Sequence, residues 1–250
     1  MADNDKALAP AAAKPTALAV IGTFTKDAEA IREFVEDGGL QFSDLPQIKP
    51  PAAGGKNWEM PDGSATQAFR GVVLMQQTTR SYWSQSSGDN APPDCSSPDG
   101  VTGYGDIGHG PGSRACDACP WSQFETAKNA KGEPTRGQAC KLGTNMVVLC
   151  NEAGRLPAIV ALPPTSALSA RQFRNDIFRM DKRRHEVVAE FTLEQKGEGQ
   201  QRYSVAHIKP VDSLGAEDVA QVEAVSSAFL PAISRMFASR LGASAQQAEG

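Results

Sequence analysis

The sequence predicts an α+β protein with an OB-like β-barrel core, a zinc-binding loop insertion and a long C-terminal helix. Three observations lead to this prediction. Apolar runs of strand length flank a helical segment, and the middle of the chain is rich in Gly, Pro and Cys. The third observation is an amphipathic helical pattern near the C-terminal end of the chain. We expect one domain over residues 16–240, with the insertion at about 84–143 and the helix at 216–240. Residues 1–15 are expected to be disordered and residues 241–250 to form a flexible tail.

Composition narrows the class of protein. The chain has 250 residues, with 25 Lys and Arg against 29 Asp and Glu, and a formal charge of −4. Its 40% of hydrophobic residues is enough for a buried core. No run approaches the ~18 apolar residues of a membrane span, and the N-terminus lacks the pattern of a secretory signal. We therefore expect a cytoplasmic protein that would hold any nucleic acid through a local basic patch.

Hydrophobic periodicity predicts the elements along the chain. The expected elements are helix 27–37, strands 69–77, 145–150 and 158–162, helix 166–180, hairpin strands 185–195 and 203–208, and helix 216–240. Ser166 is expected to cap the second helix. A helix between the third and fourth strands, followed by a hairpin, is the order of an OB-type barrel, although many mixed α+β folds share it.

Four of the five cysteines have the spacing of a metal site. Cys95, Cys116, Cys119 and Cys140 follow the pattern C-x20-C-x2-C-x20-C. The CxxC turn brings two thiolates to one ion, and the outlying cysteines complete a tetrahedral set. Metal binding would also organise an insertion that is poor in apolar residues, so we predict a structural zinc, while a closed thiolate site admits iron as well. The alternatives are a redox dithiol and unrelated free cysteines, and Cys150 is expected in the core.

The sequence offers little for catalysis, and we predict that the protein is not an enzyme. It contains no HExxH, GxSxG or Walker motif, and the GxGxxG letters of residues 103–108 are interpreted as loop composition. Three aspartates of the insertion, Asp94, Asp99 and Asp106, are interpreted as turn formers. The enzymatic alternative is a nucleic-acid-processing enzyme that uses these carboxylates with a divalent ion.

Aromatic and basic residues point to nucleic acid. Aromatic rings in predicted loops could stack on unpaired bases, and neighbouring basic groups could bind phosphates. The expected nucleic-acid-binding residues are Trp58, Arg80, Tyr82, Trp83, Trp121, Phe124, Lys141, Lys182, Arg183 and Arg184. Segment 166–184 alone carries six basic and two acidic residues. The alternatives are that Trp58 and Trp83 cover the core or the metal loop, and that Lys182 to Arg184 form a solvated turn.

The order of several short segments resembles a known family. These segments are DLPQIKPPAAGGKNWEM, GVVL, SYWS, SGDNAPPDCSSPDG, CDACPW, GQACK and LPAIVALPPTS, within residues 44–210. They resemble single-stranded DNA-binding replication accessory proteins of bacteriophages and mobile elements that carry a zinc-holding insertion. The resemblance implies an OB-like core, the four cysteines as zinc ligands, and Tyr82, Trp83 and Trp121 near the binding face. Residues 243–250 contain a single acid, Glu249, and so lack the acidic tail of many such binders.

We therefore predict a largely sequence-independent single-stranded DNA-binding protein. It would act in replication or recombination of a phage or mobile element, in the cytoplasm of a bacterial host. Replication or recombination proteins and a second copy of the chain are expected as partners. Helix 216–240 is the candidate for self-association, and the alternative is that it packs on the barrel. The alternative is a zinc-stabilised adaptor that binds a host or phage replication or defence component.

Overall fold

A long strand, β4 (Ala68–Tyr82), connects a helix-covered sheet to a smaller region that contains four of the cysteines. The computed structural model describes residues 28–38, 40–51, 54–84, 93–107, 111–129, 131–154, 156–199 and 202–247. The helices are α2 (Ala28–Gly38), α3 (Ala167–Arg179) and α4 (Ala216–Gln247). The strands of the large sheet are β1 (Gln47–Ile48), β4, β5 (Cys95–Ser97), β6 (Thr102–Asp106), β7 (Pro111–Ala115), β8 (Lys141–Leu149), β9 (Ala158–Leu162), β10 (Val187–Lys196) and β11 (Tyr203–Ser213). A separate small ribbon pairs β2 (Trp58–Glu59) with β3 (Ala65–Thr66).

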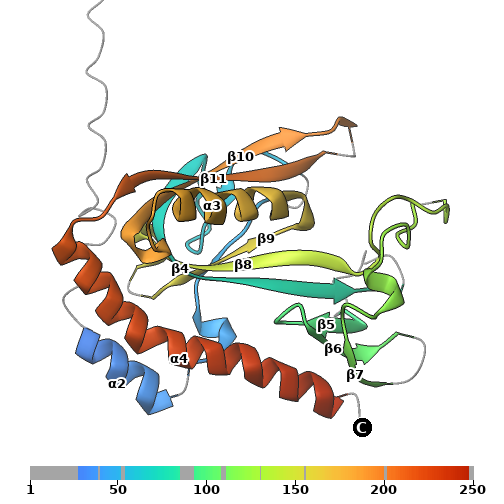
Figure 1. Ribbon diagram of the computed structural model, residues 1–250, viewed down its shortest axis with the longest axis horizontal. Coiled ribbons are helices and arrows are strands. Elements are labelled where there is room, and N and C mark those ends of the chain that lie inside the picture. The colour runs from blue at the N-terminus through green and yellow to red at the C-terminus, as the bar shows by residue number, and fades with distance from the viewer. Residues whose placement is uncertain are drawn as a thin grey trace, which may run out of the picture.

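One edge of β4 changes partner along its length. Residues 68–72 pair with β10, residues 80–82 pair with β5, and β8 follows the opposite edge from Val72 to Ser81. The first half of β4 therefore belongs to the five antiparallel strands β9-β8-β4-β10-β11, and its last residues lead into β5-β6-β7 (Figure 1). We call the described residues from 93 to 140 the cysteine module.

Helices cover both faces of the main sheet. Side chains alternate between the faces, so neighbouring residues such as Val72 and Val73 enter different cores. One core packs the sheet against Phe173 and Ile177 of α3, and the other packs it against α2 and α4 (Figure 1). The sheet residues of the α3 core include Phe69, Val73, Met146, Val148, Val160 and Phe191, and those of the α4 core include Val72, Leu74, Val147, Leu149 and Ile159. This region, the sandwich, has three layers.

Serines at the start of α3 cover the outer edge of β11. The backbone N–H of Ala206 donates to Ser166 Oγ at 2.9 Å, and that of Ile208 donates to Ser169 Oγ at 3.0 Å. Every second residue of β11 directs its backbone N–H to this edge, and the next one after Ile208 is Pro210, which has no N–H. An exposed strand edge can pair with another chain, so these contacts close β11 against further strand addition.

The α+β class and the C-terminal helix are confirmed, whereas the barrel prediction needs correction. In the described residues, β1 and β11 lie at different edges and do not pair, so the sheet does not close. The physical reason is that helices bury both faces, which leaves no barrel interior to fill. Strand 158–162 matches β9 at both ends, and the hairpin 185–195 with 203–208 corresponds to β10 and β11.

Other elements differ in detail from the sequence predictions. The C-terminal helix continues through Pro231 to Gln247, so residues 241–247 are helical and are not a tail. Ser166 occupies the N-cap position of α3 but makes no capping hydrogen bond, because its hydroxyl accepts from β11. The insertion contains three strands instead of loops alone. The prediction for residues 1–15 lies outside the described residues.

Candidate functional site

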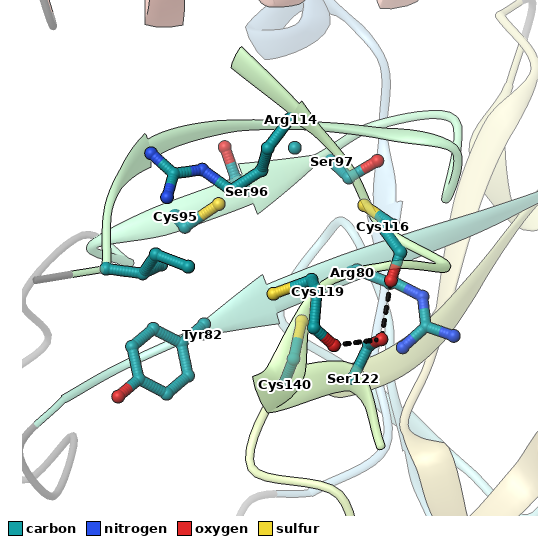
Figure 2. A pocket seen from close by; sticks show the side chains of 12 residues that line it. Arg80, Tyr82, Cys95, Ser96, Ser97, Arg114, Cys116, Cys119, Ser122 and Cys140 are labelled. Carbon is teal, nitrogen blue, oxygen red and sulfur yellow. Dashed lines mark hydrogen bonds between the residues drawn. The ribbon is translucent and has the colours of Figure 1, made fainter. Parts of the chain in front are cut away.

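The four spaced cysteines line one pocket (Figure 2). Cys95 lies in β5, Cys116 follows β7, Cys119 ends the short turn after it, and Cys140 directly precedes β8. Cys95, Cys116 and Cys140 are buried, with exposed fractions of 7%, 5% and 6%. Residues far apart in the sequence are thus brought together as the spacing predicts.

Local hydrogen bonds fix the CxxC turn. Ser122 Oγ donates to the carbonyl oxygens of Cys116 and Cys119, at 2.5 and 2.8 Å. The Cys140 N–H donates to the Trp121 carbonyl at 2.8 Å, which ties the last cysteine to the turn that carries the two central ones. Ser122 is 4% exposed, so this small network is shielded from water.

Two glycines of β6 shape the pocket. A Cβ at Gly103 would lie 3.1 Å from Cys95 Sγ and 3.4 Å from Cys116 Sγ, so both sulfurs rest against bare backbone. Gly105 has a φ of +133°, and a Cβ there would lie 2.0 Å from the Asp94 carbonyl oxygen. Residues 103–106 of the GxGxxG letters therefore lie in strand β6, which corrects their interpretation as loop composition, and residue 108 lies outside the described residues.

Two arginines line the same pocket as the cysteines. Arg80 comes from β4 and Arg114 from β7. Nε and Nη1 of Arg80 are buried and have no hydrogen-bond partner among the described residues. Arg114 donates from Nη2 to the Gly105 carbonyl at 3.0 Å. In Figure 2 the two guanidinium groups lie on opposite sides of the four sulfurs.

Burial and the arginines act on the thiols in opposite directions. Burial raises the pKa of Cys95 to about 11, nearby Cys140 adds to the rise, and Arg114 opposes it. Burial also raises the pKa of Cys140 and of Cys116, and Arg80 opposes both rises. Burial of these three cysteines therefore favours the neutral thiol, and the two arginines favour the thiolate.

The cysteines are free thiols in this structure. Among the described residues, no group of three or more His, Cys, Asp or Glu side chains is arranged to hold a metal ion. The donor set nevertheless suits one: four thiols from separate segments share a pocket, a glycine leaves room beside two of them, and cationic groups surround them. Cys150 is 0% exposed in the α3 core, as expected, and burial raises its pKa to about 12.

The aspartates of the insertion form loop contacts. Asp99 Oδ1 accepts hydrogen bonds from the N–H groups of Val101 and Thr102 and from the Ser97 hydroxyl, at 2.8 to 2.9 Å. Asp94 Oδ2 accepts from the Ser84 N–H at 2.5 Å. For these two residues the structure agrees with their interpretation as turn formers.

Several aromatics predicted to bind nucleic acid do not present a free face. Trp58 is 0% exposed and packs edge-on against Phe69, with ring centroids 5.3 Å apart, so its predicted stacking role is corrected to a core role. Tyr82 is 7% exposed and stacks on Trp121 at 5.3 Å, where both pack beside the cysteines. Trp83 is half-buried. Phe124, in contrast, is 74% exposed.

The predicted basic residues point in different directions. Arg183 Nη1 lies 3.6 Å from Glu223 of α4, and Lys141 Nζ donates to a backbone carbonyl at 3.0 Å. Lys182 is exposed, whereas Arg184 is half-buried. Burial, with Arg174 as a second cause, lowers the pKa of Arg184. The run from Lys182 to Arg184 is therefore not one continuous patch.

A surface that the residue-by-residue prediction missed lies on α3. Arg171, Arg174 and Phe178 occupy positions i, i+3 and i+7, so they share one helix face, which we call the α3 face. Phe178 is 84% exposed. Arg171 and Arg174 make no hydrogen bond or ion pair with any residue that the structure describes. Helical periodicity could have revealed this face, since Phe173 and Ile177 mark the buried face of the same helix.

Comparisons with protein-family models, curated proteins and solved structures gave no match. Among the described residues, no helix combines the length and apolar character needed to cross a membrane.

Proposed function

We propose that the protein binds single-stranded DNA with little sequence preference through the α3 face. The observation that carries this proposal is Phe178, 84% exposed on a helix face shared with two unpaired arginines. An exposed ring can stack on an unpaired base, a contact worth ~1–3 kcal/mol. Guanidinium groups beside it bind phosphates, and neither contact depends on base identity.

A pair of neighbouring arginines supports an anionic ligand. Arg184 is half-buried near Arg174, which is exposed, and the two repel each other. No carboxylate of the described residues forms an ion pair with either one. A bound phosphate would offset the repulsion and restore the polar contacts that burial removes from Arg184.

The biological setting of this proposal rests on the sequence resemblance. We place the protein in replication or recombination of a phage or mobile element, in the cytoplasm of a bacterial host, as a binding protein without enzymatic activity. Its partners would be single-stranded DNA, replication or recombination proteins, and a second copy of the chain.

We also propose that Cys95, Cys116, Cys119 and Cys140 hold a structural zinc ion. Their convergence on one pocket and the space beside Gly103 support this site. Four thiolates would leave no open coordination position, so the ion would stabilise the cysteine module and take no part in a reaction. Zinc uptake would release the thiol protons that burial retains.

Fluorescence anisotropy with labelled single- and double-stranded oligonucleotides tests the DNA proposal. We expect metal-loaded protein to prefer single strands and to lose affinity as salt rises. Phe178→Ala should weaken binding by about 5- to 150-fold, which corresponds to ~1–3 kcal/mol. Phe124→Ala is a matched control, because it removes a comparably exposed ring from the cysteine module.

Two results would contradict the α3 face as the binding surface. Unchanged affinity of Phe178→Ala would do so directly, and a larger loss for Phe124→Ala would move the surface to the cysteine module. No binding of single strands at low salt would reject the DNA proposal, and the zinc-stabilised adaptor would become the leading interpretation.

A further inference from the structure

Arg80 has an unusual environment for a strand residue. It lies near the end of β4, paired with Leu142 of β8 on one side and Ser97 of β5 on the other. Its Nε and Nη1 atoms are buried without an acceptor among the described residues. Leaving buried donors of a charged group unsatisfied is costly, so the position favours an anionic partner.

The nearest anions that the pocket can supply are thiolates. Arg80, Arg114 and the four cysteines line the same pocket. The Arg114 guanidinium lies on the Cys95 side of the four sulfurs, and the Arg80 guanidinium lies on the opposite side (Figure 2). Each guanidinium group therefore lies beside a different side of the sulfur cluster.

Positive charge beside the sulfurs would offset the negative charge of such a centre. Four thiolates around a divalent ion carry a net charge of 2−, whereas around a trivalent ion they carry only 1−. The arginines therefore stabilise the divalent form more than the trivalent form. Uncompensated charge in a buried site is costly, so the two arginines favour the divalent ion.

We propose that Arg80 and Arg114 are charge-compensating residues of a four-thiolate metal centre and make it selective for a divalent over a trivalent ion. This inference rests on the proposed four-cysteine site. Zinc is divalent only, and if the centre held iron, the two arginines would favour its ferrous over its ferric state.

Zinc competition with a chromogenic chelator tests the inference on the full-length protein. We expect Arg80→Gln and Arg114→Gln each to weaken zinc binding by about 10- to 100-fold, the usual effect of removing an outer-shell partner. Arg80→Lys, which keeps the charge, should recover part of the loss. Arg136→Gln is the matched control, since Arg136 is exposed on the same module and does not line the pocket.

A second readout separates charge compensation from a purely structural role. In iron-substituted protein, Arg80→Gln should shift the midpoint potential of the iron(III)/iron(II) couple to a more negative value, because losing a positive charge favours the ferric ion. The thiolate-to-metal absorption of cobalt-substituted protein shows whether the four ligands remain in place.

The outcomes distinguish the inference from the site on which it rests. If the wild type takes up no zinc, or Cys116→Ser does not reduce uptake, the four-cysteine site is wrong. If the wild type binds one zinc while both Arg→Gln variants keep wild-type affinity, or the potential does not change, charge compensation is wrong and the site stands.

Discussion

The sandwich and the cysteine module share strand β4 but are stabilised in different ways. The sandwich has two extended apolar cores, with fully buried rings such as Phe173, Phe191 and Phe229. The buried cluster of the module consists of Cys95, Ile107 and Cys140 together with Tyr82 of β4, and Cys119, Trp121 and Ala139 pack against it. Apolar burial is therefore sufficient to explain the first region and insufficient for the second, where three of these seven side chains are themselves proposed metal ligands.

This difference predicts that the two regions can be disrupted separately. A change in the sandwich should lower the global free energy of unfolding, because both of its cores depend on the same sheet. A change at the cysteines should unfold the module locally and leave the sandwich folded, because β5, β6 and β7 extend from one end of β4.

The largest effect is expected from Cys116→Ser. Removing one ligand should abolish most of the zinc affinity, which for structural four-ligand sites is of order 10 kcal/mol. Hydrogen exchange should then show that amides of β5 to β7 lose protection while amides of β10 and β11 keep theirs. Cys150→Ala is the control, since Cys150 is buried in the sandwich and should leave zinc stoichiometry unchanged. Loss of protection throughout the protein would contradict separate stabilisation.

Phe173→Ala should give the opposite pattern. Phe173 is 0% exposed at the centre of the α3 core, and truncating such a ring typically costs about 3–5 kcal/mol through lost burial and a remaining cavity. Urea unfolding followed by far-UV circular dichroism measures this loss. Zinc stoichiometry of the folded variant should stay at the wild-type value, and a loss of zinc below the unfolding transition would show that the regions are coupled.

Ser169→Ala should destabilise the sandwich by a smaller amount. The change removes the acceptor of the Ile208 N–H at a site where the serine is 8% exposed, and an orphaned buried donor costs about 1–3 kcal/mol. Ser213→Ala is a suitable control, because Ser213 lies at the exposed end of the same strand. Equal stability of the two variants in urea would show that α3 does not satisfy the edge of β11.

These serines also show where sequence reasoning succeeds and where it stops. A continuous apolar run indicated strand 158–162, and the cysteine spacing indicated which residues share a pocket. The hydrophobic pattern could not show whether the sheet closes into a barrel. The outer edge of β11 is covered by Ser166 and Ser169, and such contacts between distant segments leave no signal in the pattern. The exposure of individual side chains was equally difficult to predict, since Trp58 follows a Gly-rich stretch and is nevertheless fully buried.

The smallest effect on stability is expected at the α3 face, which belongs to the sandwich but contributes little to its core. Replacing Arg171 and Arg174 together by Gln removes two exposed charges without described partners, so the free energy of unfolding should stay within about 0.5 kcal/mol of the wild type. DNA binding should respond differently. Each lost phosphate contact lowers the slope of log affinity against log salt by about 0.7 for single strands, so the double variant should lose about 1.4. Arg136→Gln, an exposed arginine of the cysteine module, should leave the slope unchanged. If Arg136→Gln reduced the slope and the α3 variant did not, the DNA would lie on the cysteine module, and the sandwich would be its support.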